Sequence, residues 1–335
     1  MTLAASVVLP TYNRPHLLER SLAALIDQDP STPAYEIVVV DDGSRPETGE
    51  TVRRVAGSDA RVSYLRHDTN RGRSATRNTG IRHARGDIVL LVDDDVVVDS
   101  AYLRAHLEAH AAAEPARVAV VGDLRFPPEV IAASNYAKYL QSRYLGGRDP
   151  NELLRLCPSD LHPRFLISAV ASVRREDLLA VEMFDEAIRF YGCEDHIFAD
   201  RLRRRGVRIV FAPAAKALHH DPVTVSWYRA KMQESGREGT PVLLRTAPEF
   251  LEQTGFADLM PVDWSRDRPG RVARKLSLRA ALNPLVIRAL EAWSAATDHI
   301  GWLYVPAVGR ALSAGWFLQG VGMPRNGPRL LIYGE

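Results

Sequence analysis

Two apolar runs in the first third of this chain end abruptly in carboxylates, and this pattern constrains the fold more than any other feature. The first run is VVVDDGS (residues 38–44) and the second is LLVDDDVVVD (91–100). Runs that are apolar at every position are typical of strands buried on both faces in a parallel sheet. Ligands bind such sheets outside the carboxyl ends of the strands. We therefore expect five carboxylates to converge on one crevice: Asp41, Asp42, Asp93, Asp94 and Asp95.

The segments around these runs alternate between strand and helix patterns. After Pro15, apolar residues recur at helical spacing, which predicts an amphipathic helix over 15–28. Further strands are expected at 6–10, 36–40, 61–66, 87–92, 116–122, 167–173 and 207–211. Further helices are expected at 46–55, 74–84, 99–113 and 194–205. This order predicts an α/β fold with a mostly parallel sheet flanked by helices.

The pattern weakens in two regions. From residue 132 to 163, several prolines and the pair Gly146-Gly147 predict an irregular connection over the crevice. After about residue 245, scattered prolines and arginines precede moderately apolar segments near 281–295 and 301–319. We therefore expect an α/β domain of residues 1–240, with halves at about 1–122 and 123–240, and a mainly helical C-terminal extension of residues 241–335.

The composition restricts the location and partners of the chain. A net charge of +2 over 335 residues argues against binding dominated by nucleic-acid phosphates. The two cysteines, Cys157 and Cys193, lack metal-ligand spacing, so a disulfide framework is not expected and a reducing compartment is. We find no signal-peptide pattern and no apolar run of about 18 residues, so no transmembrane helix is predicted. These features favour a cytoplasmic protein.

The carboxylate clusters have a chemical and a structural interpretation. Adjacent carboxylates repel one another unless a cation joins them, and Mg²⁺ or Mn²⁺ binds one or two carboxylates together with substrate phosphates. Asp93 and Asp95 are spaced to flank such an ion, although a solvated acidic turn before the next helix would read the same way. Asp41 and Asp42, which precede Gly43 and Ser44, form a tight turn, accept hydrogen bonds from a base or ribose, or do both.

Three further groups have residue types that suit catalysis or binding. Arg71, Arg73 and Arg77 precede or open a predicted helix, where they form either a diphosphate site or a solvated basic face. Glu194 and Asp195 open another helix, where a carboxylate interacts favourably with the helix dipole or acts as a general base. His219 and His220 follow the strand at 207–211, as structural residues or as metal ligands.

Five segments, in this order and spacing, resemble glycosyltransferase family 2, the inverting enzymes of the GT-A fold. They cover roughly residues 4–235 and read VVLPTYNRP, VVVDDGS, NRGRSATRNTGIRHARGD, LLVDDD and FDEAIRFYGCEDHIFADRLRRRGVRIVFAPAAKALHH. The resemblance implies a GT-A (Rossmann-like) catalytic domain, a nucleotide-sugar donor and a divalent ion, Mn²⁺ or Mg²⁺. It also implies direct displacement at the anomeric carbon, with UDP-sugars as the commonest donors.

The resemblance implies a role for individual residues on the donor side. The nucleoside would be held by Thr11 and Asp41, together with Asp42. The pocket around it would be lined by Pro10, Tyr12 and Arg14. Arg77 would lie near the diphosphate, as would Arg71 from the same basic segment.

The resemblance also assigns the metal site and the base. Asp93 and Asp95 would form the D-x-D motif, with Asp95 as the direct metal ligand and Asp94 near the donor ribose or sugar. His219, six residues after Pro213, fits the metal-binding histidine position better than His220. Asp195, the second acid of the Glu194-Asp195 pair, would be the catalytic base.

The hypothesis that follows is an inverting, metal-dependent glycosyltransferase of bacterial origin. It would add one sugar to a small-molecule, lipid-linked or glycan hydroxyl, because the Q-x-x-R-W motif of processive relatives is absent. One alternative is a sugar nucleotidyltransferase, which typically carries a glycine-rich basic loop where this chain has Pro10-Thr11-Tyr12-Asn13. A second is a non-catalytic nucleotide-sugar binding protein, which would lack the acids present here.

The extension has three interpretations at this stage. It packs on the catalytic domain, forms a homodimer interface, or docks on the inner face of a membrane as an interfacial helix. Nearby arginines are compatible with the last of these: Arg266, Arg268, Arg271 and Arg274.

Overall fold

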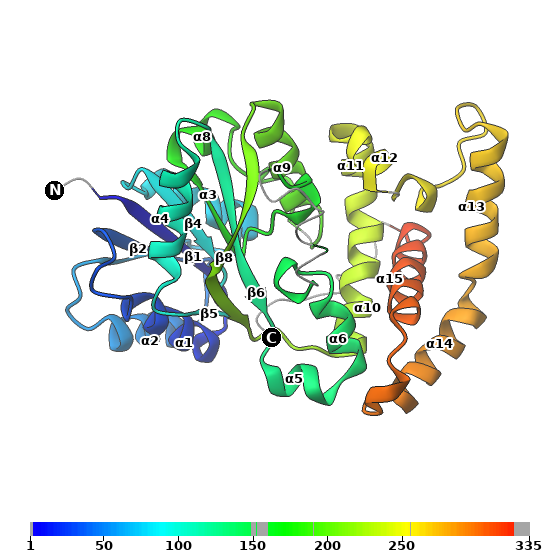
Figure 1. The fold of residues 1–335 in the computed structure, drawn as a ribbon, viewed down its shortest axis with the longest axis horizontal. Coiled ribbons are helices and arrows are strands. Elements are labelled where there is room, and N and C mark those ends of the chain that lie inside the picture. The colour runs from blue at the N-terminus through cyan, green and yellow to red at the C-terminus, as the bar shows by residue number, and fades with distance from the viewer. Residues whose placement is uncertain (1–2, 149–151, 153–159, 190, 255, 325–335) are drawn as a thin grey trace.

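The structure is a computed structural model that describes residues 3–148, 152, 160–189, 191–254 and 256–324. Cys157, part of the connection expected at 132–163, and the last residues of the extension lie outside the described residues. In Figure 1 the sheet and the helices that flank it form the left part of the molecule. The helices from the C-terminal part of the chain form the right part.

The described residues form one mixed sheet of eight strands in the order β3-β2-β1-β4-β7-β6-β8-β5. Its strands are β1 (Ala5–Thr11), β2 (Tyr35–Asp41), β3 (Val62–Arg66), β4 (Ile88–Val92), β5 (Val96–Val98), β6 (Val118–Arg125), β7 (Val170–Arg174) and β8 (Arg208–His219). Strands β1 to β4 pair in parallel, as do β6 and β8, whereas β7 and β5 are antiparallel to their neighbours. The predicted α/β class with a mostly parallel sheet is confirmed.

Helices cover this sheet along its length. They are α1 (Pro15–Ile26), α2 (Pro46–Ala56), α3 (Arg73–His83), α4 (Tyr102–Ala113), α8 (Arg175–Ala180) and α9 (Glu194–Arg204). Helix α3 packs on β1 and β2, and α4 packs on β6 and β8. Helices α1 and α2 both begin with proline, whose fixed φ and missing N–H suit the first helical turn. Helix α9 ends before Gly206, which adopts the positive φ typical of a helix stop.

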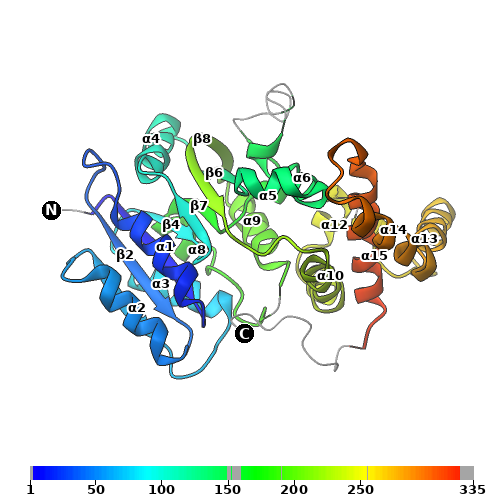
Figure 2. The same cartoon turned by 90° about the horizontal axis from the view of Figure 1, so that it is seen from below.

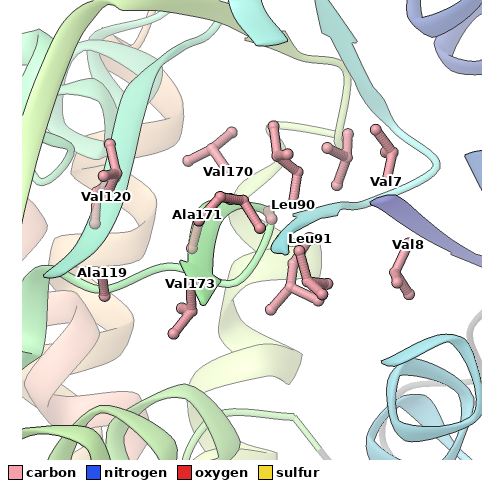
Figure 3. Packing of buried hydrophobic residues seen from close by; sticks show 14 of the residues in the cluster. Val7, Val8, Leu90, Leu91, Ala119, Val120, Val170, Ala171 and Val173 are labelled. Atoms are coloured by element: carbon pink, nitrogen blue, oxygen red, sulfur yellow. The ribbon is translucent and has the colours of Figure 1, made fainter. Parts of the chain in front are cut away.

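The core of the sheet is built from the continuous apolar runs. Val7 and Val8 of β1 lie beside Leu90 and Leu91 of β4, and Val170 of β7 continues the layer (Figure 3). All five side chains are buried. Their close packing fixes the carboxyl ends of β1, β2 and β4 next to one another, because these strands pair in register.

The C-terminal part of the described chain is helical, as predicted. It contains α10 (Val225–Glu234), which continues through a π-helical turn, and then α11 (Thr240–Thr246), α12 (Pro248–Thr254), α13 (Pro269–Ala281), α14 (Pro284–Thr297) and α15 (Pro306–Val321). Helix α15 packs against α10 and α14, and Figure 2 shows the three lying side by side. A Cβ at Gly320 would meet the backbone oxygen of Gln233 at 2.1 Å, so glycine permits this close approach. Among the described helices, none has the length and apolarity needed to cross a bilayer.

The prediction of an irregular connection after residue 132 is wrong for its first part. The chain forms α5 (Pro128–Ala133) and α6 (Asn135–Gln141) instead. Ser134 caps α6 by accepting a hydrogen bond from the Ala137 N–H at 3.0 Å. The tyrosines of α6 pack in a second core with Trp316 of α15. This helix is stabilised by residues far along the chain, so local periodicity could not predict it.

Two features at the far edge of the sheet also differ from expectation. Strand β8 was expected to end at residue 211 but continues to His219, past an irregularity in its pairing with β6. Strand β5 was not expected at all, because the prediction joined these residues to the carboxylate run. The two strands pair antiparallel and place Val96 opposite His219.

The core predicts a clear contrast between two leucines. Leu90→Ala removes a fully buried side chain from β4 and should lower the free energy of unfolding by about 2–5 kcal/mol. Leu285→Ala is the matched control, because Leu285 on α14 is 75% exposed and its loss should cost less than about 0.5 kcal/mol. Urea unfolding followed by circular dichroism measures both. Equal losses would contradict the packing described here.

Candidate active site

A cavity of about 250 Å³ opens where the sheet meets the C-terminal helices. Residues of the C-terminal extension, Leu243, Phe256 and Phe317, form part of its wall. The charged residues of the wall are Arg14, Arg73, Arg77, Asp93, Asp95, Arg143, Arg164, Glu194, Asp195, Asp221 and Lys231, with His196 and His219. The cavity therefore collects residues from both ends of the chain into one polar site.

Asp94, two residues after the end of β4, is buried and lies outside the cavity wall. Its carboxylate accepts a hydrogen bond from the Thr11 hydroxyl at 2.7 Å and lies 3.4 Å from the Arg14 guanidinium. Its backbone oxygen accepts a hydrogen bond from Ser21 at 2.9 Å. Burial raises the pKa of Asp94 to about 7, and the neighbouring Asp95 adds to this effect while Arg14 opposes it. Asp94 thus joins β4 to β1 and α1.

Asp95 and His219 face each other inside the cavity. Asp95 Oδ2 accepts a hydrogen bond from Arg14 at 2.8 Å, and Oδ1 lies 3.5 Å from His219 Nε2. Burial favours the neutral acid, but His219 and Arg14 outweigh it and hold the pKa of Asp95 below its usual range. In return Asp95 raises the pKa of His219 against the effect of burial. Each group of this pair therefore stabilises the charged form of the other.

The two histidines at the end of β8 have different surroundings. The His219 ring stacks on Phe126 at 5.5 Å between ring centres, and Nδ1 lies 3.3 Å from the Tyr144 hydroxyl. The His220 ring instead lies 3.2 Å from the Arg20 guanidinium, outside the cavity wall. His219 is consequently the histidine that can reach a ligand beside Asp95.

The residues at the end of β4 suit a divalent ion only in part. Asp95 Oδ1 is a buried carboxylate oxygen without a hydrogen-bond partner, and it faces the imidazole of His219. Asp93 points elsewhere and pairs with Arg77 at 2.6 Å. In the described part of the chain, no group of three or more His, Cys, Asp or Glu side chains is arranged to hold a metal ion. Asp95 and His219 could thus supply two ligands, and substrate oxygens would have to complete the coordination.

Arg77 is a buried cation between two carboxylate groups. Its Nη2 donates to Asp93, while Nε and Nη1 are buried without hydrogen-bond partners. The guanidinium lies over the Phe184 ring at 5.5 Å. Asp93, Asp195 and Glu194 raise its pKa against the effect of burial. A fixed guanidinium with unused N–H groups can bind an oxyanion.

Glu194 and Asp195, at the start of α9, differ in their hydrogen-bond partners. Glu194 accepts hydrogen bonds from the N–H groups of Gly192 and Cys193, at 2.9 and 3.0 Å, and so shapes the turn before the helix. Asp195 Oδ2 accepts a 3.3 Å hydrogen bond from the Ser168 N–H, and its Oδ1 is buried without a partner. Burial, followed by the charge of Glu194, raises the pKa of Asp195 to about 6. Such a carboxylate can accept a proton near neutral pH.

The carboxylates after β2 hold the backbone of nearby loops. Asp41 accepts hydrogen bonds from the Ser44 N–H at 2.8 Å and from the Tyr64 hydroxyl. Asp42 accepts hydrogen bonds from the N–H groups of Arg71 and Gly72, each at 2.8 Å, just before α3. The tight-turn interpretation is confirmed, and contact with a nucleoside stays a prediction.

The predicted site residues separate into two groups. Those in the cavity wall are Arg14, Arg77, Asp93, Asp95, Glu194, Asp195 and His219. Those outside it are Pro10, Thr11, Tyr12, Asp41, Asp42, Arg71 and Asp94. The Arg71 guanidinium lies 3.3 Å from Glu186 at the surface. The second group lies at the ends of β1, β2 and β4 and in the segments that follow them, except for Arg71, which lies between β3 and α3.

Sequence reasoning missed several residues of the cavity wall. Arg143 comes from the region 132–163, where the pattern weakens, and Arg164 directly follows that region; no motif marks either residue. Asp221 and Lys231, which pair with each other, follow the histidines. Tyr228, like Lys231, lines the cavity.

Comparisons with known proteins agree with these features. The model for "Glycosyl transferase family 2" matches residues 6–171. Chondroitin synthase from Escherichia coli is 28% identical over 243 residues, which are 65% of this chain and 34% of that protein. Validoxylamine A glucosyltransferase from Streptomyces hygroscopicus subsp. jinggangensis is 37% identical over 114 residues, 34% of this chain and 27% of that protein. The chain thus spans about a third or less of the length of these relatives.

A solved structure shares the fold over nearly the whole chain. It is a mannosyltransferase from Pyrobaculum calidifontis in complex with GDP-Man and Mn²⁺, with a TM-score of 0.58 and 20% identity. The match covers 93% of this chain and 85% of that one. The GT-A fold expected from the sequence is therefore confirmed.

The surroundings of Asp195 predict its titration. In the wild type its carboxyl group should titrate near pH 6, and Glu194→Gln should lower the pKa by removing a neighbouring negative charge. Carbon-detected NMR of aspartate carboxyl groups measures both, with Asp195→Asn to assign the signal. Glu249→Gln, an exposed substitution on α12, should leave it unchanged. A wild-type pKa near 4, the usual value of an aspartate, would contradict this description of the site.

Proposed function

The chain belongs to glycosyltransferase family 2, and we propose that it transfers one sugar from a nucleotide-sugar to an acceptor hydroxyl with inversion at the anomeric carbon. Asp195 is the observation that carries the proposal. It is buried in the cavity wall, its Oδ1 has no hydrogen-bond partner, and its pKa is raised to about 6. These are the properties of a general base that removes a proton from a hydroxyl. The acceptor would be a small molecule, a lipid-linked sugar or a glycan.

The donor nucleoside would bind at the carboxyl ends of β1 and β2. Thr11, Asp41 and Asp42 lie there, and the backbone N–H of Asp42 donates to the Thr11 carbonyl at 2.9 Å. Pro10, Tyr12 and Arg14 would line this pocket, with Asp94 toward the ribose or sugar. UDP-sugars are the favoured donors in the proposal, while the solved mannosyltransferase of the same fold has GDP-Man bound.

A divalent ion, Mn²⁺ or Mg²⁺, would be held by Asp95 and His219. Their fit rests on the unpartnered Oδ1 of Asp95 facing the His219 imidazole. Asp93, the other acid of the D-x-D motif, would reach the ion only after leaving Arg77. When bound, such an ion neutralises the negative charge that develops on a leaving diphosphate. The solved mannosyltransferase has Mn²⁺ bound, which supports the proposal.

The chain's own residues would supply the rest of the chemistry. Arg77, fixed by Asp93, would direct Nε and Nη1 at the diphosphate oxygens and stabilise the leaving group. Asp195 would take the proton of the attacking hydroxyl on Oδ1, while the Ser168 N–H orients the carboxylate through Oδ2. Arg71 would contact the diphosphate only from outside the cavity wall, because its guanidinium forms an ion pair with Glu186. Holding the hydroxyl opposite the leaving group favours single displacement.

The two alternatives agree less well with the site. A sugar nucleotidyltransferase typically carries a glycine-rich basic loop after its first strand, whereas this chain has Pro10-Thr11-Tyr12-Asn13 there. A non-catalytic binding protein has no use for a buried carboxylate with an unpartnered oxygen, which costs stability. Both alternatives predict that the chain transfers no sugar.

The partners and boundaries of the extension stay predictions. Leu285 and Trp302 are 75% and 84% exposed around α14, which would suit either a membrane surface or a second copy of the chain. The cytoplasmic location and the domain boundary near residue 240 stay predictions as well.

Replacing the base tests the proposal directly. Asp195→Asn should lower kcat for sugar transfer by about 10²- to 10⁴-fold, because asparagine cannot accept the proton. Binding of the donor should be unchanged, since Asp195 lies on the acceptor side of the proposal. Asp200→Asn on the same helix is the control and should keep full activity. Normal turnover by Asp195→Asn would refute the assignment of the base.

Calorimetric titration with UDP, GDP and dTDP, each with and without Mn²⁺, tests the donor site. One nucleotide should bind tightly and only with Mn²⁺, and Asp95→Ala or His219→Ala should weaken this binding strongly. His220→Ala is the matched control, because that ring faces Arg20. If none of the nucleotides binds in the presence of Mn²⁺, the proposed function loses its donor.

A further inference from the structure

The cations of the cavity wall are unequally paired. Most have a carboxylate within 4 Å: Arg14 with Asp95 at 2.8 Å, Arg77 with Asp93 at 2.6 Å, Arg73 with Glu194 at 3.8 Å, and Lys231 with Asp221. Arg143 and Arg164 differ, because neither forms an ion pair with any acid of the described residues. Among the described residues of the wall, these two arginines are thus the ones that lack a carboxylate partner.

Arg143 lies at the end of α6 among aromatic rings. Its Nη1 donates to the Tyr139 hydroxyl at 3.0 Å, and its guanidinium lies 5.9 Å from the centre of the Tyr139 ring. Apart from burial, the groups that act most on its pKa are the phenols of Tyr139, Tyr228 and Tyr191, none of which is a carboxylate. Tyr191 and Tyr228 also line the cavity. Nothing among these neighbours neutralises the guanidinium.

Arg164 lines the same cavity and also lies against an aromatic ring. Its guanidinium lies 4.7 Å from the centre of the Phe165 ring. Burial and the positive charges of Arg148 and Arg143 lower its pKa. Arg148 has its own partner in Glu152. Arg164 and Arg143 therefore repel each other across the cavity unless an anion lies between or beside them.

Both arginines are linked to the segments that carry Asp195. Arg164 precedes the segment 166–169, whose Ser168 N–H binds Asp195. Arg143 acts electrostatically on His196, the residue after Asp195. The donor diphosphate already has Arg77, Arg14 and the proposed metal site near β4. An additional anion bound at Arg143 and Arg164 would therefore belong to the acceptor.

We propose that Arg143 and Arg164 form an anion subsite, and that the acceptor carries a phosphate or carboxylate group that binds there while its hydroxyl faces Asp195. The planar guanidinium group suits both anions, because it can donate two parallel hydrogen bonds to them. This inference rests on the proposed function, since it names the class of acceptor for the same cavity. It requires no residue outside the described chain.

Three matched glycosides test the proposal: methyl β-glucoside, methyl β-glucuronide and methyl β-glucoside 6-phosphate. Each is titrated by ligand-observed NMR into the full chain, first alone and then with the nucleoside diphosphate and Mn²⁺ that calorimetry selects. The variants are R143Q/R164Q, the charge-retaining R143K/R164K, and R288Q as a control on the exposed surface of α14. Urea midpoints verify that each variant is folded.

At least one charged glycoside should bind about tenfold more tightly than the neutral one, which is the effect of one charged hydrogen-bonded contact. R143Q/R164Q should remove this preference, R143K/R164K should keep part of it, and R288Q should keep all of it. The carboxylate and phosphate arms show which anion the subsite takes. If the neutral glycoside binds as tightly as both anions, or if R143Q/R164Q keeps the preference, the proposal is wrong.

The design separates this proposal from the proposed function. Failure of every nucleotide to bind would remove the donor, yet the titration without nucleotide would still report on the arginines. Conversely, normal nucleotide binding with no anion preference would leave the transferase proposal intact and overturn only the anion subsite.

Discussion

The short antiparallel pairing of β5 with β8 is the constraint on which the site depends. It sets Val96 opposite His219, and the His220 N–H donates to the Asp95 carbonyl at 2.8 Å. Backbone hydrogen bonds therefore hold the main chains of Asp95 and His219 next to each other, and Asp95 Oδ1 lies 3.5 Å from His219 Nε2. The pairing exists only because β8 continues past the irregularity after Gly122 in its register with β6. A small change in register would separate the two residues that could hold an ion.

Charge gives the carboxylates of one cavity different properties. Asp95 lies against His219 and Arg14 and stays ionised, which suits a ligand of a cation. Asp195 is buried with Glu194 as its nearest charged neighbour, so its pKa rises to about 6 and it can exchange a proton. When two similar groups lie in different environments, their pKa values move apart, and the two groups can take different acid–base roles. The same comparison separates Glu194 from Asp195, because Glu194 uses its oxygens to hold the turn before α9.

The sequence predicted the helices and strands that a local residue pattern defines. It missed those that are stabilised by contacts with distant parts of the chain. Helix α1 and strand β2 were predicted within a few residues, because apolar periodicity and the flanking proline or aspartates define them. Helix α6 was missed because its tyrosines pack on Trp316, far along the chain. Strand β5 was missed because three residues have no stable conformation without β8. In the site, the motif residues Asp95, Asp195 and His219 were found, whereas Arg143 and Arg164 lie in no motif and emerge only from the fold.

The cavity is built by residues from distant parts of the sequence. The family model matches residues 6–171, which contain the ends of β1, β2 and β4 and also Arg143 and Arg164. Asp195 and His219 come later in the chain, as do Phe256 and Phe317 of the extension, and all four line the cavity. Helix α15 reaches the cavity because glycine lets it approach α10 closely. On our proposal, the acceptor of this chain is selected by Arg143 and Arg164, two charged residues of the cavity wall that no sequence motif marks.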